Sequence, residues 1–307
     1  MSIVALFSGQ GAQKVGMGQD FYESSATARA MMDQANDILG YSLTSVMFEG
    51  PEEELTRTSR CQPALYLHGL VAMTLFAERV KDFSLSATAG LSLGEFTAHA
   101  AAHTFSFADG LKLVAKRGAL MEEACEKTQG SMIALLGGEV EQIRALAQAC
   151  DVDIANINAP GQIVLSGSVA GIQAVNDQHK EFGIRRAAIL NVAGAYHSRL
   201  MQSAQDQLAP ELQAVAMQNP SVPVVCNFGA SLVSDPAEIR SMLEKQVTGT
   251  VRWTESIETL RSHGHQRFIE FGLGKIIAGM VKKIDKDAEV ISIEDMPSLE
   301  AALETWG

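Results

Sequence analysis

The chain has 307 residues, of which 47% are hydrophobic and 20% are charged, so it is long enough to bury a sizeable core. Its formal net charge of −12 argues against a broad surface for nucleic acid or for an anionic membrane. The four cysteines show neither a C-x-x-C pair nor metal-ligand spacing, which indicates free thiols in a reducing compartment. The first residues do not show the basic segment and long apolar core that are typical of a signal peptide, and no apolar run reaches transmembrane length. We therefore expect a soluble, cytoplasmic protein.

The first expected strand covers residues 3–7 and runs into the glycine-rich loop Ser8-Gly9-Gln10-Gly11. This loop does not fit a dinucleotide fingerprint or a P-loop, because Lys14 stands where the third glycine belongs and no Gly-Lys-Ser/Thr follows. One interpretation is that the backbone N–H of Gln10 stabilises a developing oxyanion. The other is a flexible loop over the sheet edge, and the loop taken alone favours this second interpretation.

Two helices are expected over residues 22–39 and 63–80, where apolar residues recur at spacings of three and four. The acidic segment between them, residues 51–54, is typical of a solvated helix start. His68 has apolar neighbours, which is typical of a packed core histidine.

Residues 90–94, Gly-Leu-Ser-Leu-Gly, fit the G-x-S-x-G nucleophile elbow, in which a serine sits on a tight turn between a strand and a helix. The context agrees, because residues 85–89 predict a buried strand and residues 93–103 an Ala-rich helix. A side chain at Gly90 or Gly94 would collide with the neighbouring strand or helix. A glycine-lined packing turn without catalysis fits the same residues, so Ser92 is a candidate nucleophile only.

A further helix is expected over residues 107–124, and Arg117 falls within its apolar stripe. The stripe consists of Leu113, Val114, Leu120, Met121 and Ala124. An arginine that points into a protein needs an anion, because a buried unpaired charge is costly. The anion is either a nearby Asp or Glu in a structural salt bridge or the carboxylate of a substrate.

The next stretch predicts the order β-α-β-β-α-β, which is that of a ferredoxin-like unit. Its expected strands are 131–136, 153–157, 162–166 and 186–192, and its expected helices are 140–149 and 169–182. We expect a small ferredoxin-like subdomain, residues 129–194, inserted into a large α/β-hydrolase-like domain with a parallel-sheet core. Residues 1–128 and 195–307 form that large domain.

His197 lies in the segment Gly-Ala-Tyr-His-Ser directly after an expected strand, at a strand-to-helix junction where catalytic groups gather. His99 and His103 lie two and three turns along the elbow helix, about 10 Å or more from Ser92. Elimination therefore favours His197 as the base, with a solvent-facing histidine as the alternative. The elements expected after it are strands at 222–226 and 267–271, helices at 236–247 and 254–262, and a tight turn at 272–275.

Taken together, these motifs resemble the malonyl-CoA:acyl-carrier-protein transacylases, the acyltransferases of fatty-acid synthesis. The resemblance covers essentially the whole chain. It rests on residues 7–13, 90–96, 116–118 with Met121, 156–162, 194–198 with Met201, and Gln246 before 251–253. Several motifs in a fixed order are far more specific than any one of them.

The resemblance implies a role for each matching residue. Ser92 would become acylated by malonyl-CoA, with His197 as general base and then acid. The backbone N–H groups of Gln10 and Leu93 would form the oxyanion hole, and Arg117 would pair with the malonyl carboxylate. A backbone carbonyl orients the histidine in this family, and Gln246 matches the residue that supplies it.

The resemblance also implies the partners, which are malonyl-CoA and an acyl carrier protein, with no cofactor and no metal. Both proteins would be acidic, so docking would need a local basic patch, for which Arg185, Arg186 and Lys275 are the candidates. The chain departs from the common pattern at Ser8 and Leu273, where proline is usual, and at Leu91, where histidine is common.

Leu91 occurs in part of the family, and Tyr196 favours malonyl over methylmalonyl as the acyl group. Three other functions stay open. They are an acyltransferase of a polyketide-type pathway, a thioester hydrolase that uses the same Ser92 and His197, and a non-catalytic module that binds a carrier protein.

Overall fold

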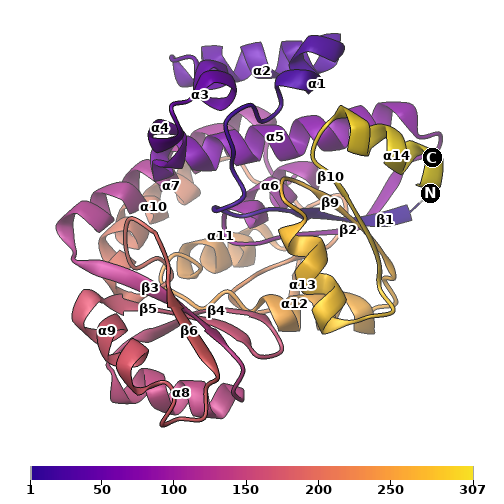
Figure 1. Cartoon of the computed structure of the whole chain (residues 1–307). Helices are drawn as coiled ribbons and strands as arrows, with labels where there is room; N and C mark the ends of the chain where they lie inside the picture. Colours follow the sequence, from indigo (N-terminus) through magenta and orange to yellow (C-terminus); the bar gives the residue numbers. More distant parts are fainter. Residues whose placement is uncertain (1, 307) are drawn as a thin grey trace.

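The computed structural model describes residues 2–306 and contains two separate β-sheets (Figure 1). The larger sheet has six strands in the order β10-β9-β1-β2-β7-β8, and all neighbours are parallel except β7 and β8. Its strands are β1 (Ser2–Phe7), β2 (Ser84–Gly90), β7 (Val224–Val225), β8 (Leu232–Val233), β9 (Arg267–Phe271) and β10 (Glu289–Ile293). The α/β class and the parallel-sheet core expected from the sequence are confirmed.

Strand β1 lies inside the sheet and is buried on both faces, which explains its continuous apolar sequence. Successive side chains of a strand point to opposite faces. Ile3, Ala5 and Phe7 therefore pack on one side of the sheet, and Val4 and Leu6 on the other. Each face consequently needs its own layer of helices.

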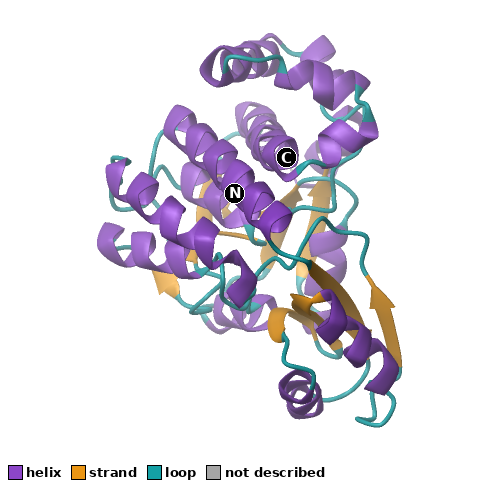
Figure 2. Cartoon of the chain, turned by 90° about the vertical axis from the view of Figure 1, so that its left-hand side faces the viewer, coloured by secondary structure: helices purple, strands orange, loops and turns teal. Residues whose placement is uncertain are grey.

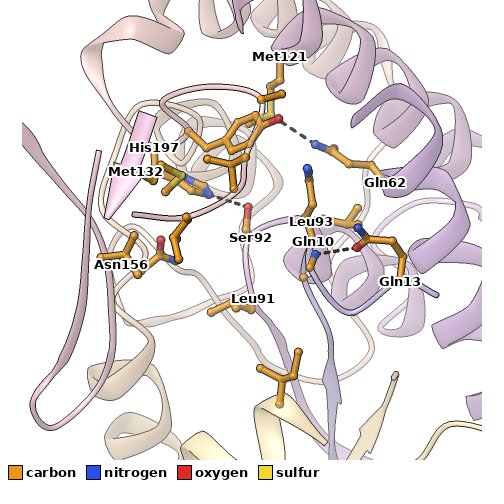
Figure 3. A pocket seen from close by; sticks show the side chains of 18 of the residues that line it. Gln10, Gln13, Gln62, Leu91, Ser92, Leu93, Met121, Met132, Asn156 and His197 are labelled. Atoms are coloured by element: carbon orange, nitrogen blue, oxygen red, sulfur yellow. Dashed lines mark hydrogen bonds between the residues drawn. The ribbon is translucent and has the colours of Figure 1, made fainter. Parts of the chain in front are cut away.

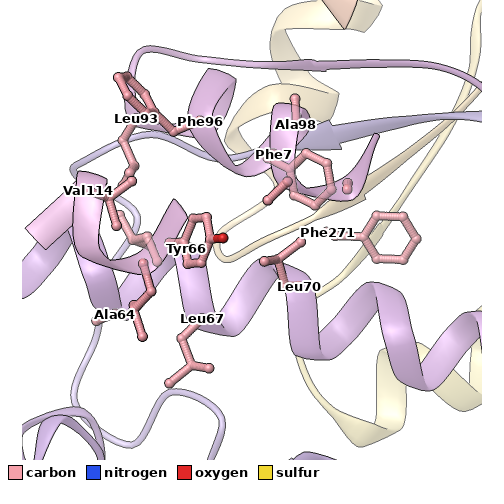
Figure 4. Close-up of a cluster of buried hydrophobic side chains, with 14 of the residues drawn as sticks. Phe7, Ala64, Tyr66, Leu67, Leu70, Leu93, Phe96, Ala98, Val114 and Phe271 are labelled. Carbon is pink, nitrogen blue, oxygen red and sulfur yellow. The ribbon is translucent and has the colours of Figure 1, made fainter. Parts of the chain in front are cut away.

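Helices α5 (Thr58–Arg79), α6 (Leu93–Ala101) and α7 (Phe107–Lys127) form the layer on the Phe7 face, and α12 (Trp253–Ser262) and α13 (Ile276–Ile284) form the layer on the Val4 face (Figure 1). Helix α5 is buried along most of its length. The rings of Phe7 and Phe271, with centroids 6.0 Å apart, lie close to Leu70 of α5 (Figure 4).

The remaining helices of this part of the chain lie around these layers. They are α1 (Gln19–Ser24), α2 (Ala26–Leu39), α3 (Leu43–Glu49), α4 (Glu52–Thr56), η1 (Arg199–Met201), α10 (Gln202–Ala214), α11 (Pro236–Lys245) and α14 (Met296–Trp306). The single helix expected over residues 22–39 is wrong, because extended backbone at Ser25 separates α1 from α2. The Ser25 hydroxyl accepts the N–H of Ala28 and so begins α2.

The second sheet has four strands in the order β4-β5-β3-β6, each antiparallel to its neighbours. This sheet and its helices form the lower part of the molecule in the view of Figure 2. Its elements are β3 (Gly130–Leu136), α8 (Val140–Ala149), β4 (Asp153–Ala159), β5 (Gln162–Ser168), α9 (Val169–Gln178) and β6 (Arg186–Ile189). The two helices share one apolar cluster with these strands. Backbone hydrogen bonds join β4 to the rest of the chain, from Val251 N–H to Ala155 O and from Ile157 N–H to Val251 O.

Two elements of this unit end earlier than expected. Helix α9 ends at Gln178, and residues 179–183 form turns that finish at Gly183, where φ is 75°. Strand β6 ends at Ile189 and not at residue 192. Beyond it, residues 190–193 leave the sheet and line the pocket described below.

The four cysteines are buried and free of disulfide bonds. Within residues 2–306, no helix has the length and apolar character needed to cross a membrane.

Helices α5 and α7 approach closely where Gly118 faces the backbone of Thr58. A Cβ added at Gly118 would lie 2.5 Å from the carbonyl oxygen of Thr58. We expect Gly118→Ala to lower the free energy of unfolding by about 1–3 kcal/mol, because neither helix can move without disturbing the core. Thermal or chemical denaturation measures this change.

The matched control is Gly279→Ala, which changes a glycine inside α13 that has open space around its Cα. Alanine favours a helix over glycine by about 0.5–1 kcal/mol, so this variant should be as stable as the parent or more so. Equal destabilisation of the two variants would contradict the close α5–α7 contact.

Candidate active site

Ser92 lies on the turn between β2 and α6, with a φ of 55° and a ψ of −105°. This backbone conformation is rare for a residue with a side chain. The glycines on either side make the turn possible. A Cβ on Gly90 would lie 2.0 Å from the carbonyl of Gly94, and one on Gly94 would lie 2.2 Å from the carbonyl oxygen of Phe7. The steric role expected for both glycines is confirmed.

Asn227, which follows β7, holds the same turn with its side chain. Its Oδ1 accepts the Ser92 N–H at 2.6 Å, and its Nδ2 donates to the carbonyl of Gly90 at 2.8 Å. The N–H of Ser92 is therefore occupied, so a ligand at the turn must use other backbone donors.

His197 is the histidine that the structure brings to Ser92, with its Nε2 2.7 Å from the serine Oγ (Figure 3). Its Nδ1 lies 2.8 Å from the backbone carbonyl of Gln246. A carbonyl only accepts, so Nδ1 carries the proton and Nε2 accepts the hydroxyl proton of Ser92. His99 is instead buried against Thr104, and His68 is buried near Glu294, away from the pocket.

The pKa of the His197 imidazole is lowered to about 4, first by its burial and second by the nearby cation of Arg117. The bonds to the Gln246 and Gly249 backbone oppose this shift. The ring is therefore neutral at neutral pH and able to accept a proton.

Arg117 is 1% exposed and lies beside the Ser92–His197 pair. Its Nη2 donates to Ser92 Oγ at 3.1 Å and to Gln246 Oε1 at 2.9 Å, and its Nη1 donates to Gln62 Oε1 at 2.8 Å. Within the described chain it forms no ion pair, so the salt bridge considered from the sequence is not the observed arrangement. Burial lowers the pKa of Arg117 to about 10, so the group is still a cation at neutral pH.

Ser92, His197 and Arg117 line one pocket of about 430 Å³ between the two sheets (Figure 3). Gln10 and Leu93 lie on its wall near Ser92. In the part of the chain that the structure describes, the backbone N–H of neither residue has an acceptor. These two donors are thus available to an oxygen atom bound near Ser92.

Three residues of the site were missed by the sequence analysis, namely Gln62, Glu95 and Asn227. Glu95 is buried and accepts hydrogen bonds from the Gln246 side chain and from the Asn227 backbone. The available signals were weak. Glu95 is an acidic residue in an Ala-rich helix, and Gln62 is a polar residue in an apolar one.

The three basic residues considered for carrier docking do not line the pocket. Arg185 and Arg186 are exposed, and Arg186 pairs with Leu136, four positions along β3 from the pocket residue Met132. Lys275 is exposed and precedes Ile276, which does line the pocket. Among residues 2–306, no group of three or more His, Cys, Asp or Glu side chains could hold a metal ion.

Known proteins resemble the chain over nearly its whole length. An acyl transferase domain model matches residues 4–298. The malonyl CoA-acyl carrier protein transacylase of Bacillus subtilis is 38% identical over 310 residues, covering 99% of this chain and 96% of that protein.

Solved structures agree with the sequence match. The acyl-carrier-protein-S-malonyltransferase of Bartonella henselae has a TM-score of 0.94 at 34% identity, covering 99% of each chain. A malonyl-transacylase in complex with its type II PKS acyl-carrier protein also has a TM-score of 0.94, at 33% identity, covering 99% of this chain and 100% of that chain.

The lowered pKa of His197 predicts how the site responds to acid. We expect NMR to show its imidazole titrating near pH 4, well below the ordinary value of 6.5. Between these values the unfolded chain binds the proton and the native chain does not. The stability that His197 contributes is therefore present above about pH 6.5 and is lost as the pH falls towards 4.

Arg117→Gln should raise the His197 midpoint, because it removes a neighbouring positive charge. A midpoint near 6.5 in the native parent protein would contradict the burial of this ring.

Proposed function

The chain belongs to the acyl transferase domain family, as its motifs suggested, and we propose on that premise that it transfers malonyl from malonyl-CoA to the phosphopantetheine thiol of an acyl carrier protein. The observation that carries this proposal is the buried Arg117 cation, which has only neutral partners and adjoins the Ser92–His197 pair. A substrate with a carboxylate close to its thioester supplies an anion that can contact the guanidinium directly.

The first half-reaction acylates the enzyme. Ser92 Oγ attacks the thioester carbonyl while His197 Nε2 takes the hydroxyl proton. The backbone N–H groups of Gln10 and Leu93 form the oxyanion hole for the tetrahedral intermediate. The C–S bond then breaks, His197 returns its proton to the CoA sulfur, and malonyl-Ser92 remains.

The second half-reaction reverses these roles. His197 takes the proton of the carrier thiol, whose sulfur attacks the carbonyl of malonyl-Ser92. The ester C–O bond breaks, and His197 returns the proton to Ser92 Oγ. The Gln246 carbonyl keeps Nε2 directed at the reacting oxygen in both halves, because it fixes the proton on Nδ1.

Arg117 binds the malonyl carboxylate with its planar guanidinium, which suits a two-point contact with a carboxylate. In malonyl a single methylene separates the carboxylate from the thioester carbonyl. A cation 3.1 Å from the nucleophilic oxygen is therefore close enough to contact the carboxylate when the thioester carbonyl lies against Ser92. Gln62 and Gln246 support the guanidinium with neutral acceptors and leave its charge for the substrate.

We also propose the domain organisation inferred above, with a ferredoxin-like subdomain over residues 129–194 and an α/β-hydrolase-like domain over 1–128 and 195–307. The antiparallel order β4-β5-β3-β6 supports the first part of this proposal. Arg185, Arg186 and Lys275 stay candidate contacts for the acidic carrier, and of these Lys275 has the better support because it adjoins the pocket.

Ser92→Ala tests the function directly. Intact-protein mass spectrometry after mixing with malonyl-CoA should show a malonyl adduct on the parent protein and none on this variant. His197→Ala should retain slow acylation, because the oxyanion donors and the bound geometry survive.

A malonyl adduct on Ser92→Ala would refute the assignment of the nucleophile. Rapid malonate release without any carrier would favour the hydrolase instead, and a parent protein that never becomes acylated would favour a non-catalytic module.

Arg117→Ala tests the choice of acyl group. Acetyl transfer should rise relative to malonyl transfer, because malonyl loses its charge partner and acetyl no longer faces a buried cation. The difference should be on the order of 2–5 kcal/mol in activation free energy. Equal losses for malonyl-CoA and acetyl-CoA in single-turnover assays would make Arg117 a structural residue.

A further inference from the structure

Building on the proposed function, we propose that Glu95 is a positioning residue: its ionised carboxylate acts through the Gln246 side chain to balance the Arg117 charge and to fix the direction of the guanidinium.

A continuous chain of hydrogen bonds joins the two charged groups. Glu95 lies in the first turn of α6, three residues after Ser92, and is fully buried. Its Oε2 accepts from Gln246 Nε2 at 2.6 Å and from the Asn227 N–H at 3.0 Å. The other end of the same amide, Gln246 Oε1, accepts from Arg117 Nη2 at 2.9 Å.

The amide of Gln246 can adopt two opposite orientations, and Glu95 selects one of them. A carboxylate only accepts hydrogen bonds, so it holds the NH₂ end of the amide towards itself. The same NH₂ group donates to the Ser92 carbonyl at 2.9 Å. The oxygen end is therefore left facing Arg117. A reversed amide would direct NH₂ at the guanidinium and leave a buried cation without that acceptor.

The indirect contact also explains how Arg117 can be buried and still bind a substrate. A carboxylate placed directly against Arg117 would occupy the donors needed for the malonyl carboxylate. Glu95 is one amide away, so it offsets the buried charge without contacting the guanidinium, whose Nε–H has no acceptor within residues 2–306 and whose Nη1 donates only to Gln62. Burial raises the pKa of Glu95 to about 7, whereas the bonds from Gln246 and Asn227 and the nearby Arg117 cation oppose this shift, so about half of the Glu95 groups are ionised at neutral pH.

Glu95 could instead serve only as a support for the Ser92 turn, because it also holds Asn227. The two roles differ in their dependence on the acyl group. A support for the turn matters equally for every acyl group, whereas the direction of Arg117 matters only for an acyl group with a carboxylate.

The test is Glu95→Gln in the full chain, with single-turnover acylation by malonyl-CoA and by acetyl-CoA. We expect kcat/KM for malonyl-CoA to fall at least tenfold, mainly through KM, and the value for acetyl-CoA to change less than threefold. When Arg117→Ala is already present, adding Glu95→Gln should lower kcat/KM for malonyl-CoA only slightly further, because both residues act on the same contact with the malonyl carboxylate.

The matched control is Glu270→Gln, which changes another fully buried glutamate. Glu270 accepts from the N–H groups of Ile277 and Ala278 and from the Ser292 hydroxyl, away from the Arg117 contacts. This variant should lower Tm and leave the malonyl-to-acetyl ratio unchanged.

Equal losses for both acyl groups in Glu95→Gln, or losses that add to those of Arg117→Ala, would overturn the proposal. If Glu95→Gln does not fold, the ratio of kcat/KM for malonyl-CoA to kcat/KM for acetyl-CoA is measured for Glu95→Asp instead. Its charge is retained but its reach is shorter, so we expect a malonyl-specific loss, and equal losses would again overturn the proposal. A parent protein that forms no malonyl adduct would refute the proposed function itself.

Discussion

The site depends on three backbone contacts that leave no space for a side chain. Gly94 lies against Phe7 of β1, Gly90 against the start of α6, and Gly9 against the carbonyl of Leu91, where a Cβ would lie 2.6 Å from the oxygen. These contacts lock β1, β2 and the elbow helix together. The proposed nucleophile, Ser92, and the proposed oxyanion donors at Gln10 and Leu93 are consequently parts of one rigid junction.

The second constraint is the cost of removing a charge from water. Arg117 is buried among amide groups and a hydroxyl, and its neighbour His197 is oriented by a carbonyl oxygen and not by a carboxylate. A carbonyl has only a partial negative charge. It can therefore fix the imidazole tautomer without forming an ion pair with Arg117 or repelling an anionic acyl group. In the described part of the chain neither residue contacts a carboxylate directly, so the positive charge of Arg117 stays available for direct contact with an anionic acyl group.

The sequence was sufficient to find the residues that belong to local patterns. Ser92 is marked by its two glycines, Arg117 by its place on an apolar stripe, and His197 by its position after a strand. The strand order could not be derived, because parallel pairing joins segments far apart in the chain. Asn227 was missed for the same reason, because its hydrogen bond to Ser92 joins two residues that are 135 positions apart in the chain. Amide side chains such as Gln62 carry no periodic signal, and their role depends on which elements meet.

Both Ser92 and His197 have a positive φ, of 55° and 56° respectively. Glycine adopts this region readily, whereas other residues are strained there by about 1–3 kcal/mol. Backbone strain taken alone therefore favours glycine at both positions. A relative that no longer needed acyl transfer could relieve this backbone strain by replacing either residue with glycine, at the cost of the contacts that the side chain makes. The backbone geometry that places the serine hydroxyl against the imidazole thus has a cost in stability at both positions.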